Sequence, residues 1–102
     1  MTINYNPTPE KFELSPAYPN PFNPITTIRY GLPMDSDLTL SIYDIQGRLV
    51  THLIRGYKSA GYYKTAWDAS GYSSGIYLMR LQTYDMNEKN TFKSVQKIML
   101  VK

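Results

Sequence analysis

The sequence predicts an all-β domain built from two packed sheets. Apolar and polar residues alternate in short runs, and a period of two is that of a strand with one buried face. Turn-forming residues separate these runs roughly every 8–12 positions, and helical periodicity of useful length is missing. Ten of the 102 residues are tyrosine, and aromatic residues favour strands. Together these features predict an immunoglobulin-like β-sandwich of about seven antiparallel strands.

The length fits one domain with a short leading segment. Residues 1–11 are polar and contain prolines, so we expect them to be the end of a linker, with the sandwich at residues 12–102. The first residues lack the basic and then apolar pattern of a signal peptide, so we expect either a cytoplasmic protein or, as we favour, a fragment of a longer protein. No apolar run is long enough to cross a membrane. The chain has no cysteine, so its stability is expected to come from the core alone.

The first part of the sandwich is rich in proline. Residues 12–14 are predicted to form a short edge strand. Pro19, Pro21 and Pro24 fix φ and remove backbone donors, so this segment cannot lie in the middle of a sheet. We expect it to run along an edge, with Tyr18 and Phe22 facing the core.

The remaining strands follow from alternation. They are predicted at residues 26–32, 38–43, 48–54, 63–67, 76–84 and 92–101. Turns are predicted at residues 44–47 and 85–90, and loops at residues 56–61 and 68–75. The side chains expected to face inward are Ile28, Tyr30, Leu32, Leu38, Leu40, Ile42, Tyr63, Thr65, Trp67, Tyr77, Met79, Leu81, Ile98 and Leu100.

Residues suited to catalysis or metal binding are few. His52 is the only histidine and cysteine is absent, so His52 is expected to be a solvent-facing strand residue and not a metal ligand. The Ser73–Ser74 pair lies in a segment where serine is common for turn formation. We therefore predict a domain that is not an enzyme and needs no cofactor or metal. Asp85, Asn87 and Glu88 offer calcium ligands, but a hairpin turn uses the same residue types.

The surplus of tyrosine leaves a second function open. Exposed coplanar rings bind sugars, and Tyr57, Tyr62, Tyr72 and Tyr84 are placed at loops or strand ends. A carbohydrate-binding or structural immunoglobulin-like accessory module of an extracellular enzyme is therefore the alternative function. The net charge of +3 lacks the basic stripe expected of a nucleic-acid-binding protein.

Four stretches are more specific than the strand pattern. They lie at residues 18–24, 43–48, 67–77 and 97–102. In this order they resemble the proline-rich opening, the YDxxGR turn, the WD…SGIY segment and the KxxLxK ending of the type A C-terminal sorting domains of type IX (Por) secretion cargo. The resemblance covers residues 12–102. A related immunoglobulin-like domain of flagellar hook-capping proteins shares the proline-rich opening.

The resemblance implies a sorting signal for an attached cargo domain. It implies recognition by outer-membrane components of the type IX machinery, export through the periplasm, and a location outside the cell or at its surface in a Gram-negative, Bacteroidetes-like bacterium. A sortase-like transpeptidase would cleave before the domain and attach the cargo to lipopolysaccharide. The family's recognition residues map onto Pro19, Asn20, Pro21, Gly75, Tyr77, Lys97 and Lys102.

The residues themselves suggest how a partner would bind. The last strand ends at the end of the chain, so we expect its free edge to pair with a partner strand, with Lys97 and Lys102 meeting acidic groups. We expect Pro19, Asn20 and Pro21 to form a docking surface, a stiff segment that blunts a sheet edge, or both. Gly75 and Tyr77 are better explained as a turn glycine and a core tyrosine than as docking residues.

Overall fold

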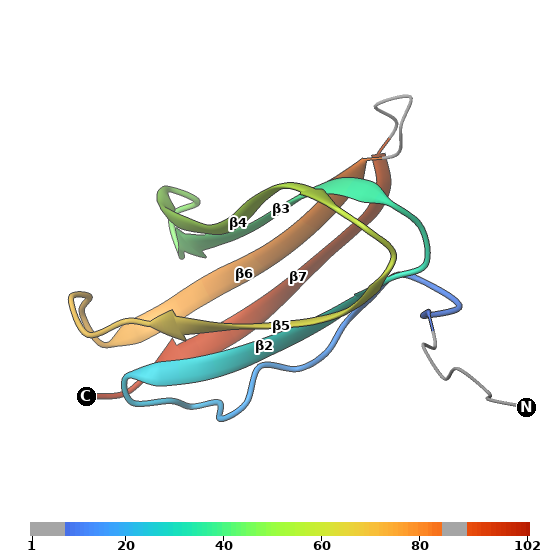
Figure 1. The fold of residues 1–102 in the computed structure, drawn as a ribbon. Coiled ribbons are helices and arrows are strands. Elements are labelled where there is room, and N and C mark those ends of the chain that lie inside the picture. The colour runs from blue at the N-terminus through green and yellow to red at the C-terminus, as the bar shows by residue number, and fades with distance from the viewer. Residues whose placement is uncertain (1–7, 85–89) are drawn as a thin grey trace, which may run out of the picture.

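The alternating runs form the strands of two antiparallel sheets. The computed structural model describes residues 8–84 and 90–102. Its strands are β1 (Glu13–Leu14), β2 (Ile25–Leu32), β3 (Ser36–Asp44), β4 (Leu49–Lys58), β5 (Gly61–Asp68), β6 (Gly75–Tyr84) and β7 (Asn90–Leu100). One sheet has the order β1-β2-β5 and the other β4-β3-β6-β7 (Figure 1). The described residues contain no helix, which confirms the predicted all-β sandwich, and none of them forms a membrane-spanning helix.

The core lies between the two sheets. Successive strand residues point to opposite faces, so each alternating run contributes every second side chain to the interior. The predicted inward residues of β2, β3, β6 and β7 are all less than 9% exposed. In β5, Trp67 is 3% exposed, whereas Tyr63 and Thr65 are half-buried. The inward pattern predicted from the sequence is therefore confirmed.

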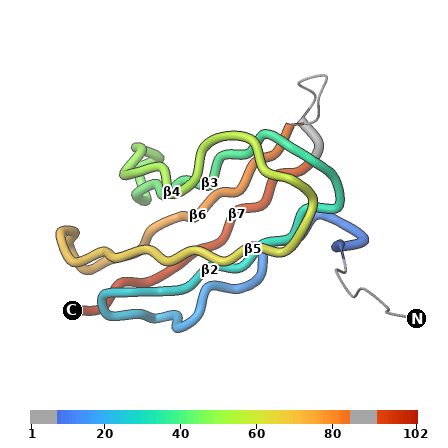
Figure 2. The backbone as a smooth tube through the Cα atoms, viewed as in Figure 1, coloured from blue at the N-terminus to red at the C-terminus, as the bar shows by residue number. Residues whose placement is uncertain are grey.

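The passage between β4 and β5 differs from the prediction. Residues 56–61 were expected to form a loop, but β4 continues through Gly56 to Lys58, and β5 begins at Gly61. Gly56 has φ +130° and Gly61 φ +154°, values that residues with a side chain rarely adopt. The glycines therefore let the chain bend from one sheet into the other without a long loop (Figure 2).

The proline-rich segment bridges the two sheets. Tyr18 pairs antiparallel with Thr27 of β2, and Phe22 pairs in parallel with Leu100 of β7. Phe22 is 2% exposed, as predicted, but Tyr18 is 75% exposed, so its predicted inward orientation is wrong. Directly opposed residues share one face of a sheet, and Tyr18 lies opposite Thr27, on the outer face. The peptide bonds before Pro19, Pro21 and Pro24 are cis.

A candidate recognition surface at the end of the last strand

Asn20 is bonded to the edge of β7. Its side-chain nitrogen donates to the carbonyl oxygen of Lys97 at 3.2 Å, and its side-chain oxygen accepts the N–H of Met99 at 2.9 Å. Phe22 continues the pattern with its backbone: its N–H donates to the Met99 carbonyl at 2.9 Å, and its carbonyl accepts the N–H of Val101 at 2.9 Å. The proline-rich segment thus acts as a further strand along this part of β7.

Gln96 fixes the beginning of the same segment. Its side-chain nitrogen donates to the carbonyls of Leu14 at 3.1 Å and Ser15 at 2.9 Å, and its oxygen accepts the N–H of Ala17 at 3.3 Å. The edge of β7 from Gln96 onward is therefore covered. The expectation that a partner strand pairs with this edge is wrong, because residues from the chain's own beginning occupy it. The bonds of Asn20, Phe22 and Gln96 support the interpretation that the proline-rich segment blunts a sheet edge.

The end of the chain is fixed to the loop before β6. The backbone N–H of Lys102 donates to the Ser74 hydroxyl at 3.0 Å, and its ammonium group donates to the Ser70 carbonyl at 2.7 Å. Gly75 opens β6 directly opposite Leu100. Its φ of +153° explains the glycine, and an added Cβ would meet no atom within 4 Å. The constraint at Gly75 is thus backbone conformation and not space.

Tyr77 is part of the core beneath this loop. It is 8% exposed, and its ring lies edge-on to Trp67 with the centroids 5.3 Å apart. Its hydroxyl donates to the Ser73 carbonyl at 2.6 Å. Phe22 and Tyr72 contact the other sides of Trp67, each with centroids 5.6 Å away. The indole therefore joins the proline-rich segment to the loop before β6.

Six of the seven predicted recognition residues are exposed at one end of the sandwich. We call them the terminal patch: Pro19, Asn20, Pro21, Gly75, Lys97 and Lys102. The C-terminus, the proline-rich segment and the loop before β6 meet there (Figure 1). Tyr77 is buried below the patch. No local pattern in the sequence points to the residues that hold the patch in place, Ser70, Ser74 and Gln96, because their bonds span 28 to 82 positions.

The 43–48 motif is explained by its turn. Both the Gln46 and the Arg48 N–H donate to Asp44 Oδ1 at 2.9 Å, and Arg48 Nε donates to Oδ2 at 2.9 Å. These bonds, above all the one from the Arg48 backbone, lower the pKa of Asp44. Gly47 has φ +84°, which a residue with a side chain rarely adopts. The motif thus specifies a tight connection between β3 and β4.

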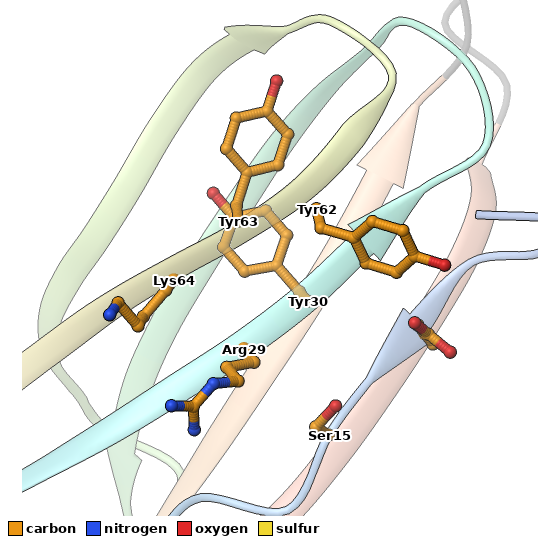
Figure 3. Close-up of a pocket in the computed structure, with 7 residues that line it drawn as sticks. Ser15, Arg29, Tyr30, Tyr62, Tyr63 and Lys64 are labelled. Atoms are coloured by element: carbon orange, nitrogen blue, oxygen red, sulfur yellow. The ribbon is translucent and has the colours of Figure 1, made fainter. Parts of the chain in front are cut away.

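The four candidate tyrosines do not form one platform. Tyr57 belongs to β4, Tyr62 to β5 and Tyr84 to β6, while Tyr72 packs on Trp67. Tyr62, 58% exposed, lines a hollow of about 400 Å³ on the outer face of the three-stranded sheet. Arg29 and Lys64 lie side by side on the other side of this hollow (Figure 3). The rings thus belong to three different strands and one loop, and are spread over both sheets.

His52 and the candidate calcium ligands are the remaining residues suited to catalysis or metal binding. His52 is exposed, as predicted, and its Nδ1 lies 2.7 Å from the Ser41 hydroxyl. Among residues 8–84 and 90–102, no three acidic, histidine or cysteine side chains gather in a way that would hold a metal ion. Asp85, Asn87 and Glu88, the candidate calcium ligands, lie outside the described residues, as does the predicted turn that contains them.

Comparison with known proteins agrees with this architecture. A search of curated proteins found no match to the sequence. Among solved structures, the chain is similar to one of dimeric latent PorU from Porphyromonas gingivalis, with a TM-score of 0.67 and 23% identity. The similarity covers 83% of this chain and 9% of the PorU chain, so this chain spans less than a tenth of that protein. At this identity the likeness supports the fold.

The family is identified by a direct match. The sequence model of the family described as "Secretion system C-terminal sorting domain" matches residues 16–100. These residues run from the start of the proline-rich segment to the end of β7, so the match includes the whole terminal patch except Lys102. The chain therefore belongs to the family of C-terminal sorting domains that the type IX secretion machinery recognises.

Proposed function

We propose that this domain is the export signal of a larger secreted protein and has no catalytic role of its own. It directs the attached cargo to the type IX machinery, which carries the cargo across the outer membrane to the cell surface. The family match over residues 16–100 is the observation that carries this function. Residues 12–102 would form the signal and residues 1–11 the end of the linker to the cargo, of which residues 1–7 lie outside the described part.

The terminal patch is the surface that we propose the machinery contacts. Its residues are exposed, yet Asn20 and Lys102 are fixed by hydrogen bonds to β7 and to the loop before β6. A surface fixed in this way loses little conformational entropy on binding. Lys97 and Lys102 add positive charge, which favours an acidic partner. Tyr77 would act indirectly, by holding the Ser73 loop against Trp67.

The position of the linker supports separate sites for recognition and for cleavage. In Figure 1 the described residues nearest the N-terminus lie at the opposite end of the sandwich from the C-terminus. Outer-membrane components bound to the terminal patch would thus leave the linker accessible. A sortase-like transpeptidase would cleave there and attach the cargo to lipopolysaccharide. The processed cargo would then stay at the surface of a Bacteroidetes-like bacterium.

Charge reversal within the patch tests this proposal. A periplasmic reporter fused to this chain would carry Lys97→Glu and Lys102→Glu together, and Arg55→Glu would serve as the control on β4. Both lysines and Arg55 are exposed. The double variant should lower surface reporter at least fivefold, and the control should leave it unchanged. Equal export from the two fusions, with both domains folded by circular dichroism, would refute recognition at the patch.

A further inference from the structure

The two sheets have four edges, and three of them are short, irregular or partly covered. β1 has two residues. The pairing of β4 with β3 shifts register twice, between Leu40 and Ser41 and between Ile42 and Tyr43, and such bulges protect an edge from pairing. β7 is covered from Gln96 onward by the proline-rich segment. Among the described residues, β5 is the longest regular edge that no other segment covers, with eight residues paired to β2 without interruption.

The hydrogen bonds of β2 show which groups of β5 face outward. Thr27 exchanges bonds with Tyr18, and the Arg29 carbonyl accepts from Ser15, so the odd-numbered residues of β2 bond on the side away from β5. Residues opposite one another in an antiparallel pair either exchange both bonds or none. Thr26, Ile28 and Tyr30 therefore bond to β5, through their partners at 67, 65 and 63. The N–H and C=O groups of Lys64, Ala66 and Asp68 consequently point to the open edge.

Lys64 and Asp68 carry charges without an ionic partner in the described part of the chain. The salt bridge found there joins Asp44 to Arg48. Lys64 lies directly opposite Arg29, and like charges in that arrangement repel. Asp68 accepts hydrogen bonds from the Ser70 N–H and hydroxyl, and these bonds lower its pKa and favour the carboxylate. Lys64 and Asp68 thus place a cation and an anion two residues to either side of Ala66, whose side chain is small.

We propose that two copies of this chain associate through β5, antiparallel and centred on Ala66. In this register Ala66 faces the partner's Ala66, and each Lys64 faces the partner's Asp68. The ion pair forms twice and offsets the repulsion between Lys64 and Arg29. A register centred on Lys64 would instead place two lysines opposite each other. The two three-stranded sheets then join into one continuous sheet across the two-fold axis.

The rest of the fold leaves room for this pairing. β4 and β5 meet at the turn after Lys58 and diverge from there, so the Ala66 end of β5 lies away from their junction (Figure 1). The paired segment is short, so the interface is small, and small interfaces give weak complexes. We therefore expect a reversible dimer that forms at high concentration, independently of export.

Sedimentation velocity of the 102-residue chain up to roughly 1 mM measures this association. Ala66→Pro removes an outward N–H that β2 does not use, so it should abolish the dimer and leave the fold intact by circular dichroism. Lys64→Asp or Asp68→Lys alone should weaken dimerisation about tenfold, and the two together should restore it. Arg55→Asp, which makes the same charge change as Lys64→Asp on the edge of β4, should leave the dimer unchanged.

Each result decides the proposal. A chain that stays monomeric over the whole concentration range would overturn it. So would a dimer that survives Ala66→Pro, or one that the double charge exchange does not restore. A dimer that Arg55→Asp weakens as strongly as Lys64→Asp would place the contact on β4 and also overturn it.

Discussion

The side-chain oxygen of Asn20 accepts the backbone N–H of Met99 at 2.9 Å, across 79 positions of the sequence. With the bond from the Asn20 amide to the Lys97 carbonyl at 3.2 Å, this side chain replaces the strand that would otherwise pair with the end of β7. The proline-rich segment thus covers the edge at the end of β7 and leaves no room there for another strand. Deleting residues 97–102 would therefore remove Ile98 and Leu100 from the core, so point variants test recognition at the patch more cleanly.

Asn20→Ala should lower the free energy of unfolding by about 1 kcal/mol, because two exposed hydrogen bonds to β7 are lost. Urea denaturation followed by the fluorescence of Trp67, the only tryptophan, measures the change. Asn23→Ala is the matched control, since Asn23 is exposed and also precedes a proline. A loss of the same size in both variants would show that the Asn20 bonds do not stabilise the edge.

Phe22→Leu should lower the free energy of unfolding by about 1–2 kcal/mol, because it removes ring contacts with Trp67 in a closed core. Tyr18→Leu, four positions earlier, should change it by less than about 0.5 kcal/mol, because Tyr18 is 75% exposed and surface substitutions have small effects. Thermal unfolding by circular dichroism compares the two. A larger effect at Tyr18 than at Phe22 would contradict the orientation of this segment.

Gly75→Ala should lower the free energy of unfolding by about 1–3 kcal/mol, because its φ of +153° is unfavourable for alanine. Gly71→Ala is the control: a Cβ at either position would meet no atom within 4 Å, so a difference between the variants reports backbone conformation. Denaturant unfolding of both proteins gives the answer. If the two variants have the same free energy of unfolding, the backbone conformation at position 75 does not require glycine.

Asp44 should contribute to stability above its unfolded pKa, near 4, and lose that contribution in acid. Its pKa is lowered in the folded chain, chiefly by the backbone N–H of Arg48, so the folded state binds the proton less readily than the unfolded state. Stability should therefore fall as the pH drops through the folded pKa. The difference in the free energy of unfolding between the wild type and Asp44→Asn should become smaller over the same pH range.

Arg48→Ala separates the backbone bond from the ion pair. It removes the Nε bond but keeps the backbone N–H that donates to Asp44, so most of the pH dependence should remain. The Arg48 side chain is 75% exposed, and exposed pairs contribute little. Denaturation midpoints between pH 2 and 7 measure this. If Arg48→Ala and Asp44→Asn lose the same share of the pH dependence of stability, that dependence comes from the ion pair and not from the turn.

The strand pattern was predictable because burial imposes a period of two. The inward residues of β3, from Leu38 to Ile42, and of β6, from Tyr77 to Leu81, follow directly from alternation. The 56–61 region, which begins and ends with glycine, is predicted as a loop. In the structure Gly56 lies opposite Leu38, so pairing with β3 overrides that local preference.

The edge of β7 was not predictable in the same way. Proline removes the periodic pattern from which orientation is inferred, so nothing in the sequence distinguishes exposed Tyr18 from buried Phe22. The Asn20 bonds depend on how two distant segments meet, which a local pattern does not encode. The family resemblance names both Asn20 and Lys97 as recognition residues, but their proximity and the bond between them emerged only from the fold.

Export of a reporter tests the central claim, that the folded sandwich is the signal, most directly. A reporter with a signal peptide and this chain at its C-terminus should reach the surface or medium of a bacterium with the type IX machinery. It should remain in the periplasm when that machinery is inactivated, and also when Phe22→Ala and Trp67→Ala together unfold the domain. A periplasmic reporter carrying the folded domain beside active machinery, or equal export of the unfolded variant, would contradict the account.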